Sequence, residues 1–367
     1  MITKEEILQL KHTTFEEADP WNPSNTLKGY LIKEQGRFYG TLILTHINGM
    51  QCKEQIVLSA PKMYYPYDKL GRFLFDKVDA IAYEKYDGTC IIGYAYEHRG
   101  KIFKTYKTRL TPFTHTGDMY DFIGLWKEML KEYPQIPSHI TMDRTIIFEL
   151  FGIKNKHLIL YDVPLDAVHL FAIDRKTNKI LMPPDISDLP LPIIRYRIKS
   201  SNDFVSYYKK MQGEIESLNT TTEEGIIGSE GTMIYIEDEE LGYKHYKCKP
   251  ASVLLEHCKP GLNKKSISAT VYNAYENFND ADINYEIVKE LLLEEFSDRE
   301  IEWKRPMVLK CIDTVKLDIQ LSNGIIKEYD KLGIKLSDDK VTVMRYMADK
   351  FGRQKSKYIF TILKALL

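Results

Sequence analysis

The chain has 367 residues, and its 51 Lys and Arg against 52 Asp and Glu give a formal net charge of −1. With 44% hydrophobic and 28% charged residues, the composition is globular and large enough for two or three domains, which excludes disordered, collagen-like and disulfide-scaffold proteins. The five cysteines lack C-x-x-C spacing and favour a reducing, cytoplasmic location. We expect no membrane partner, because no apolar run is long enough to cross a bilayer and the first residues are too charged for a signal peptide.

The first 250 residues are rich in predicted strands. A short amphipathic helix is predicted over Ile2–Leu10, and alternation of apolar and polar residues then predicts strands within 28–60 and within 78–110. Helical periodicity follows over Tyr120–Glu132 and over 201–217. Further strands are predicted at 145–152, 157–162, 168–174 and 232–249.

After Pro250 the pattern changes to helical periodicity. Strand signals fade, while apolar residues recur at spacings of three and four. Helices are predicted at about 251–258, 283–296, 306–320, 339–351 and 355–366. The sequence therefore predicts an α+β protein with a strand-rich body and a helical C-terminal region.

One lysine has a setting that suits covalent chemistry. Lys85, in the string Glu84-Lys85-Tyr86-Asp87-Gly88, ends a predicted strand directly before a tight Asp-Gly turn. A lysine amine attacks phosphorus only when it is neutral, and nearby cations favour the neutral form. The alternative is a hairpin turn preceded by a solvated lysine.

Two further lysines and two carboxylates lie at positions that suit the same phosphate chemistry. Lys247 and Lys249 alternate on a predicted strand, so both side chains point the same way and suit the charge on a nucleotide's phosphates. Glu149 lies between two apolar residues of a predicted strand, where a carboxylate needs a partner, and Glu230 precedes another strand. Both carboxylates suit ribose hydroxyls or a metal ion. The alternative for the lysine pair is a solvated face that balances the acidic turn at 237–240.

These pieces, in this order, resemble the covalent nucleotidyltransferase superfamily, which contains ATP-dependent DNA and RNA ligases and mRNA capping enzymes. The resemblance covers about residues 80–250 and rests on EKYDG at 84–88, FELFG at 148–152, Glu-Gly at 230–231 and KCK at 247–249. It implies an ATP-grasp-like nucleotidyltransferase domain of antiparallel sheets with helices. It also implies that ATP is a substrate, with Mg²⁺, or Mn²⁺ in its place, as the metal.

The resemblance carries roles onto single residues. It implies that Lys85 is the nucleophile that becomes linked to AMP, with catalytic roles for Lys247 and Lys249 as well. Metal binding is implied for Glu230 and Glu149, and Glu224, the other Glu-Gly candidate, is the alternative to Glu230. Nucleotide contacts are implied for Glu84, Asp87, Gly88, Arg109, Glu149, Phe171, Lys247 and Lys249.

The branch of the superfamily follows from what comes after the KCK motif. DNA ligases and capping enzymes normally continue into a five-stranded barrel, whereas this chain continues into predicted helices, as RNA ligases of the bacteriophage type often do. We therefore expect an ATP-dependent RNA ligase that joins RNA 5′-phosphate and 3′-hydroxyl ends through a lysyl-AMP and an adenylylated RNA. The alternatives are a DNA ligase of unusual layout and a non-catalytic RNA-binding module.

Three regions are expected on this basis. Residues 1–75 form a strand-rich extension packed on the catalytic domain, residues 76–250 the adenylyltransferase domain, and residues 251–367 a helical, RNA-binding domain. Because the motif set ends at Lys249, no site residue is expected beyond about residue 260. Basic and aromatic residues that suit RNA are concentrated at 98–109, 244–265 and 340–367, although each cluster also suits a merely solvated face.

Overall fold

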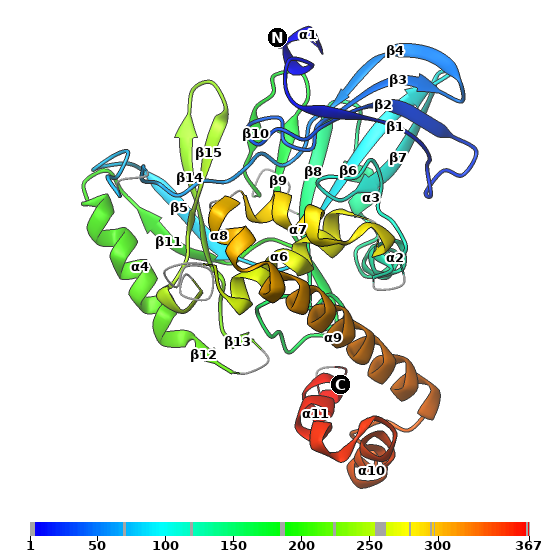
Figure 1. Ribbon diagram of the computed structural model, residues 1–367. Helices are drawn as coiled ribbons and strands as arrows, with labels where there is room; N and C mark the ends of the chain where they lie inside the picture. The colour runs from blue at the N-terminus through cyan, green and yellow to red at the C-terminus, as the bar shows by residue number, and fades with distance from the viewer. Residues whose placement is uncertain are drawn as a thin grey trace.

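Three larger antiparallel sheets and a set of C-terminal helices are the main features of the described residues (Figure 1). The computed structural model describes residues 4–68, 71–117, 120–183, 188–222, 225–253, 262–278, 280–293, 296, 298–364 and 366. The expected α+β class with antiparallel sheets is confirmed. Among the described residues, no helix is long and apolar enough to span a bilayer.

Two of the sheets face each other across a shared apolar core. The first contains, in spatial order, β10 (Ile180–Leu181), β9 (Asp166–Asp174), β8 (Arg144–Phe151), β6 (Thr89–His98) and β7 (Lys101–Lys107). The second contains β11 (Ile194–Ile198), β5 (Ala80–Lys85), β14 (Gly231–Asp238) and β15 (Gly242–Cys248). Ile92 and Ile147 of the first sheet pack with Tyr83, Met233 and Tyr235 of the second.

The outer face of each sheet is covered by helices. Helix α4 (Phe204–Leu218) packs on the second sheet through Phe204, Tyr208 and Met211. The first sheet is covered by α2 (Phe122–Glu132), near the short α3 (Ile136–His139), and by the C-terminal helices. Because side chains alternate along each strand, the residues on the inner faces form the shared core, and those near its edge can line a site.

A third sheet precedes the other two. It contains the antiparallel strands β1 (His12–Ala18), β2 (Thr26–Ile32), β3 (Leu42–Ile47) and β4 (Met50–Val57), after the short helix α1 (Lys4–Ile7). Leu27, Leu42 and Val57 of this sheet share one apolar cluster with Tyr94 and Tyr96 of β6. The N-terminal strands therefore pack directly on β6 of the first sheet, while the domain boundary near residue 75 stays a prediction.

The helical region divides into two packing groups. Helices α6 (Lys264–Asn277), α7 (Tyr285–Leu292), α8 (Asp298–Trp303) and most of the 28-residue α9 (Arg305–Leu332) share one core with the first sheet. The end of α9 forms a separate apolar cluster with α10 (Lys340–Phe351) and α11 (Ser356–Lys364). The first group is therefore part of the core of the strand-rich body and not an appendage to it.

One carboxylate in the middle of α9 connects these groups. Asp318 accepts hydrogen bonds from Lys156 Nζ (2.7 Å), from the Tyr272 hydroxyl on α6 (2.7 Å) and from the Tyr358 hydroxyl on α11 (3.0 Å). Burial alone would raise the pKa of Asp318, but the Lys156 ammonium outweighs it and the pKa is lowered. The body, α6 and α11 therefore share a single ionised partner.

Two local expectations were wrong. Residues 157–162 do not form a strand, because the Ile159 amide donates to the Asp87 carboxylate (2.8 Å) and only one bridge, Ile159 with Ile226, forms. Helix α6 was not expected, since polar residues interrupt its apolar stripe, and α9 runs twelve residues further than expected. The short elements β12 (Thr220–Thr221), β13 (Ile226–Ile227), η2 (Asp280–Asp282) and η3 (Arg353–Lys355) complete the fold.

A core substitution in α6 tests whether the helical region shares the sheet's core. Ile267 is fully buried in the common cluster, so Ile267→Ala should lower the free energy of unfolding by roughly 2–5 kcal/mol in a single urea transition. Ile102→Ala, at an exposed position on β7, is the control and should change it by less than about 0.5 kcal/mol. An effect of Ile267→Ala as small as that of the control would contradict the shared core.

Candidate functional site

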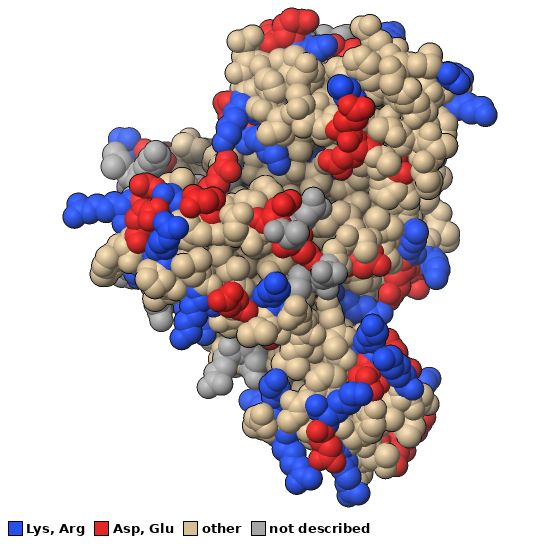
Figure 2. All heavy atoms as spheres, turned by 45° about the vertical axis from the view of Figure 1, so that its right-hand side comes forward, with Lys and Arg blue, Asp and Glu red and all other residues tan. Residues whose placement is uncertain are grey.

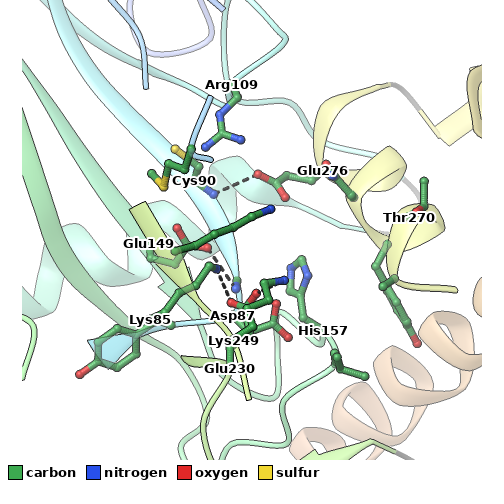
Figure 3. Close-up of a pocket in the computed structure, with 18 of the residues that line it drawn as sticks. Lys85, Asp87, Cys90, Arg109, Glu149, His157, Glu230, Lys249, Thr270 and Glu276 are labelled. Atoms are coloured by element: carbon green, nitrogen blue, oxygen red, sulfur yellow. Dashed lines mark hydrogen bonds and ion pairs between the residues drawn. The ribbon is translucent and has the colours of Figure 1, made fainter. Parts of the chain in front are cut away.

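A polar cavity of about 260 Å³ lies at the edge of the core between the two facing sheets (Figure 3). Lys85 reaches it because side chains alternate along β5: Tyr83 points into the inter-sheet core, and Lys85, two residues on, continues the same face. Glu149 is two residues after Ile147 on the facing strand, and reaches the cavity for the same reason.

The Glu230 carboxylate is held between two lysines. Its Oε2 pairs with Lys85 Nζ, and its Oε1 is 2.8 Å from Lys249 Nζ. Burial alone would raise the pKa of Glu230, but the two ammonium groups lower it to about 2. Gly231 is needed next to it, since φ is +145° and a Cβ atom there would lie 2.1 Å from the Cys248 carbonyl oxygen.

The turn after Lys85 is fixed from several sides. The Gly88 amide donates to Glu149 Oε1 (3.1 Å), and the Asp87 amide donates to the Tyr161 hydroxyl (2.6 Å). The Asp87 carboxylate accepts from the Ile159 amide, and burial raises its pKa. Asp87 therefore serves mainly to hold the turn, and so to aim Lys85.

Glu149 is recessed at the inner end of the cavity. Burial raises the pKa of Glu149 to about 8, although the nearby Lys85 opposes the shift. In this arrangement its carboxyl group is mostly protonated at neutral pH, so it can donate as well as accept a hydrogen bond. A polar ligand with hydroxyl groups suits this protonated form, whereas a bound cation would favour the ionised form.

A buried lysine positions the loop that carries Arg109. Lys107 is fully buried, and its Nζ donates to the carbonyl oxygens of Gly40 (3.1 Å), Thr108 (2.7 Å) and Arg109 (2.8 Å). Lys33 adds a fourth bond, to Leu110 O at 2.8 Å. Both lysines tie the N-terminal region to the backbone next to Arg109, which lines the cavity.

The remaining sequence-predicted residues divide into two groups. The structure brings Lys85, Asp87, Gly88, Arg109, Glu149, Glu230, Lys247 and Lys249 together around one cavity. It does not bring Glu84 or Phe171 there. Glu84 faces the other side of β5, where it bonds Ser229 and Arg195, and Phe171 is fully buried in the inter-sheet core against His245. Leu170, next to Phe171, lines the cavity instead.

Strand alternation explains the position of Glu84. The alternation that aims Lys85 into the cavity necessarily aims its neighbour Glu84 away, so a side-chain contact from Glu84 to a nucleotide does not fit this arrangement. Glu224, the alternative metal ligand, lies outside the described residues.

Residues beyond position 260 line the cavity, contrary to expectation. Helix α6 contributes Ala269, Thr270, Tyr272, Asn273 and Glu276. Glu276 Oε1 accepts a hydrogen bond from the Cys90 amide (3.0 Å), and burial raises the pKa of Glu276 to about 7 (Figure 3). No motif marks these residues; the signal available in the sequence is a polar stripe opposite an apolar one on the same helix.

No protein metal cage is present in the described residues. No group of three or more His, Cys, Asp or Glu side chains among them is arranged to hold a metal ion. Any ion in this cavity would therefore need ligands from a bound substrate in addition to one or two carboxylates.

The stabilising role of Glu230 predicts a pH dependence. Because the folded-state pKa of Glu230 lies near 2, below the ordinary value of 4.5, its contribution is complete above about pH 4.5 and is lost as the pH falls towards 2. Glu230→Gln should therefore reduce the free energy of unfolding clearly at pH 6 and progressively less at pH 4 and pH 3. The measurement is urea denaturation at each pH.

The control is Glu128→Gln. Glu128 forms an exposed pair with Lys154, so this substitution should change stability by less than about 1 kcal/mol at any of these pH values. A deficit in Glu230→Gln that does not shrink in acid would mean that the carboxylate is not ionised between its two lysines.

Comparison with known proteins finds ligases among the solved structures that are similar to this chain. No family model matches it, and no curated protein matches it by sequence. Among solved structures, an archaeal ATP-dependent RNA ligase is similar at 14% identity and a TM-score of 0.46, over 94% of this chain and 84% of that chain. A provisionally named ATP-dependent DNA ligase from Aquifex aeolicus is similar at 13% identity and a TM-score of 0.44, over 94% and 86%.

A third similar structure comes from a eukaryote. An RNA ligase of Naegleria gruberi, solved with ATP and Mn, is similar at 7% identity and a TM-score of 0.34, over 67% of this chain and 98% of that chain. With such low identities and TM-scores, the assignment of an activity must rest on the cavity itself. These similar structures are two ATP-dependent ligases and one RNA ligase.

Proposed function

We propose that this protein is an ATP-dependent RNA ligase that joins RNA 5′-phosphate and 3′-hydroxyl ends. The observation that carries the proposal is the cavity in which Lys85, Lys247, Lys249 and Arg109 converge around Glu230. Four cationic side chains in one recess suit a polyphosphate, and one of them ends a rigid strand as a nucleophile requires.

The first step would use Lys85 directly. Its neutral amine attacks the α-phosphorus of ATP, a nitrogen–phosphorus bond forms, and the bond to the bridging oxygen breaks so that pyrophosphate leaves. The amine's proton is lost, so the Lys85 nitrogen of the phosphoramide is uncharged, while the linked AMP phosphate keeps one negative charge. Lys247, Lys249 and Arg109 would offset the charge on the phosphates during this exchange.

Two further transfers would complete the ligation. The 5′-phosphate of one RNA strand attacks the lysine-bound phosphorus and takes the AMP, which restores Lys85. The 3′-hydroxyl of the second strand then attacks the activated 5′-phosphate and AMP leaves. In each transfer a good leaving group departs from phosphorus. Direct attack of the 3′-hydroxyl on a free 5′-phosphate would lack such a leaving group.

The carboxylates of the cavity fit a divalent ion. Glu230 is ionised, and loss of the positive charge on Lys85 would release its Oε2 from that ion pair. Mg²⁺, or Mn²⁺ in its place, would be held by Glu230 and Glu149 together with substrate phosphate oxygens, which is a ligand set that Mg²⁺ favours. When bound, such an ion supplies charge stabilisation on the phosphoryl oxygens.

The preference for RNA over DNA is supported by the C-terminal helices. From α6 onwards, the elements that the structure describes are all helical, so no barrel of the DNA-ligase type follows β15 within the described residues. Lys and Arg side chains also gather on the lobe made by the last helices, with Asp and Glu among them (Figure 2). A non-catalytic RNA-binding module would not need the arrangement around Lys85.

Substitution of Lys85 tests the covalent step. Lys85→Arg keeps a positive charge but cannot form the adduct, so it should give no labelled protein with radiolabelled ATP and Mg²⁺. It should still seal an RNA strand that has already been adenylylated. Lys101→Arg, at an exposed lysine of β7, is the matched control and should label as the wild type does.

Two outcomes would contradict the proposal. Labelling of Lys85→Arg would move the nucleophile elsewhere, and a wild-type protein that never labels would favour the non-catalytic module. Parallel sealing of nicked RNA and nicked DNA of one sequence decides the substrate, since faster sealing of the DNA duplex would favour the DNA-ligase alternative.

Lysines near the C-terminus test RNA binding separately from chemistry. Lys355 and Lys357 lie at the start of α11, where the neighbouring Arg353 is already paired with Asp349. Replacing both lysines by Gln should weaken RNA binding and reduce the slope of log affinity against log salt by about one to two, while leaving Lys85 labelling unchanged. The Lys53→Gln and Lys209→Gln pair, at exposed lysines outside the three basic clusters, is the control. An unchanged salt slope would show that α11 does not contact phosphates.

A further inference from the structure

Helix α6 presents two different faces. Ile267, Val271 and Ala274 are fully buried in the core shared with the first sheet. Thr270, Asn273 and Glu276 lie three residues apart, line the cavity, and therefore form a polar stripe along one side of the helix. The stripe lines the same cavity as Lys85, although none of its residues has a role in the proposed reaction.

Glu276 is anchored at the inner end of this stripe. It is only 8% exposed, and its Oε1 accepts from the amide of Cys90, the residue that pairs with Glu149 across β6 and β8. Figure 3 shows its side chain reaching from α6 toward Cys90, below Arg109. Glu276 and Glu149 thus reach the same end of the cavity from opposite sides.

The chemistry of this wall differs from that of the opposite wall. The α6 residues that line the cavity offer a hydroxyl, an amide and a carboxyl group, and none of them is Lys or Arg. Phosphates suit the cationic side around Lys85 and Lys249, whereas uncharged hydroxyl groups suit a wall whose groups both donate and accept hydrogen bonds. Acidic side chains commonly bind the hydroxyls of a ribose in this way.

We infer that the α6 stripe binds ribose hydroxyls, with Glu276 as a specificity-determining residue that favours ribose over deoxyribose. The inference rests on the proposed function and deepens it, because a ribose can come from either of two sources. One is ATP itself, and the other is the terminal nucleotide of the RNA strand. A site built around a buried carboxyl group discriminates against a ligand that lacks the hydroxyl, since the buried hydrogen bond to that hydroxyl is then lost.

Equilibrium binding in a chemically inactive background tests the first source. In full-length Lys85→Arg protein, ATP should bind roughly tenfold more tightly than 2′-deoxyATP, as loss of one buried hydrogen bond implies. Adding Glu276→Ala should bring the two affinities to within about twofold. Lys264→Ala, exposed on the same helix, is the control and should keep the preference. Where Glu276→Ala fails to fold, Glu276→Met fills a similar volume without a polar group and serves the same test.

Sealing assays test the second source. Wild-type protein and Glu276→Ala are given an adenylylated strand and an acceptor strand ending in either a ribonucleotide or a deoxyribonucleotide. Loss of the preference for the ribonucleotide end, with the ATP preference intact, assigns the stripe to the RNA end. Loss of the ATP preference assigns it to the nucleotide, and an unchanged preference in both assays overturns the inference.

Two results separate the inference from its rivals. If Mn²⁺ alone raises the melting temperature of the wild type but not that of Glu276→Met, Glu276 is a metal ligand and the inference is overturned. If wild-type protein binds ATP but never labels Lys85, the proposed ligase function fails, while the binding comparison still decides the role of Glu276.

Discussion

The whole cavity depends on one carboxylate between two ammonium groups. Glu230 is buried, and a buried charge is tolerated only when it is paired and hydrogen-bonded. Its partners come from two different strands, since Lys85 ends β5 and Lys249 directly follows β15. The pairing therefore fixes the edge of the second sheet, and it also holds Lys85, the proposed nucleophile, in place.

Support for this centre comes from parts of the chain that take no part in the chemistry. Lys107 Nζ donates hydrogen bonds to three backbone carbonyl groups, and one of these belongs to Gly40 in the N-terminal region. Burial lowers the pKa of Lys107 well below its ordinary value, and its main contribution is as the hydrogen-bond donor that shapes this loop. The N-terminal region thus affects the cavity indirectly, because it holds the backbone that carries Arg109.

Much of the site could be predicted from sequence, for a physical reason. Lys85, Glu149 and the Lys247–Lys249 pair lie on strands, where a period of two fixes which side chains share a face. The same rule, applied to Glu84, would have placed it on the opposite face, and the structure has it bonded to Arg195 there. Phe171 does point into the inter-sheet core, where it pairs with Ile147 and packs against His245, while Leu170, at the register shift between β8 and β9, lines the cavity. This shift has no local signal in the sequence.

The contribution of Glu276 could not be predicted at all. Its place in the cavity depends on how α6 docks on the first sheet, which is set by core contacts of Val271 and Ala274 with residues more than a hundred positions earlier. Local patterns do not encode such long-range docking. A polar residue on an amphipathic helix normally faces water, and only the tertiary packing turns this one inward.

The shared partner in the middle of α9 has a consequence for how the two ends of the helical region communicate. Asp318 bonds Tyr272, whose neighbour Asn273 belongs to the polar stripe, and it also bonds Tyr358 on the last helix. A change that draws either tyrosine away alters the hydrogen bonds left for the other and for Lys156. Events at the cavity wall and at the outermost helix are therefore linked thermodynamically through one carboxylate, and such linkage acts equally in both directions.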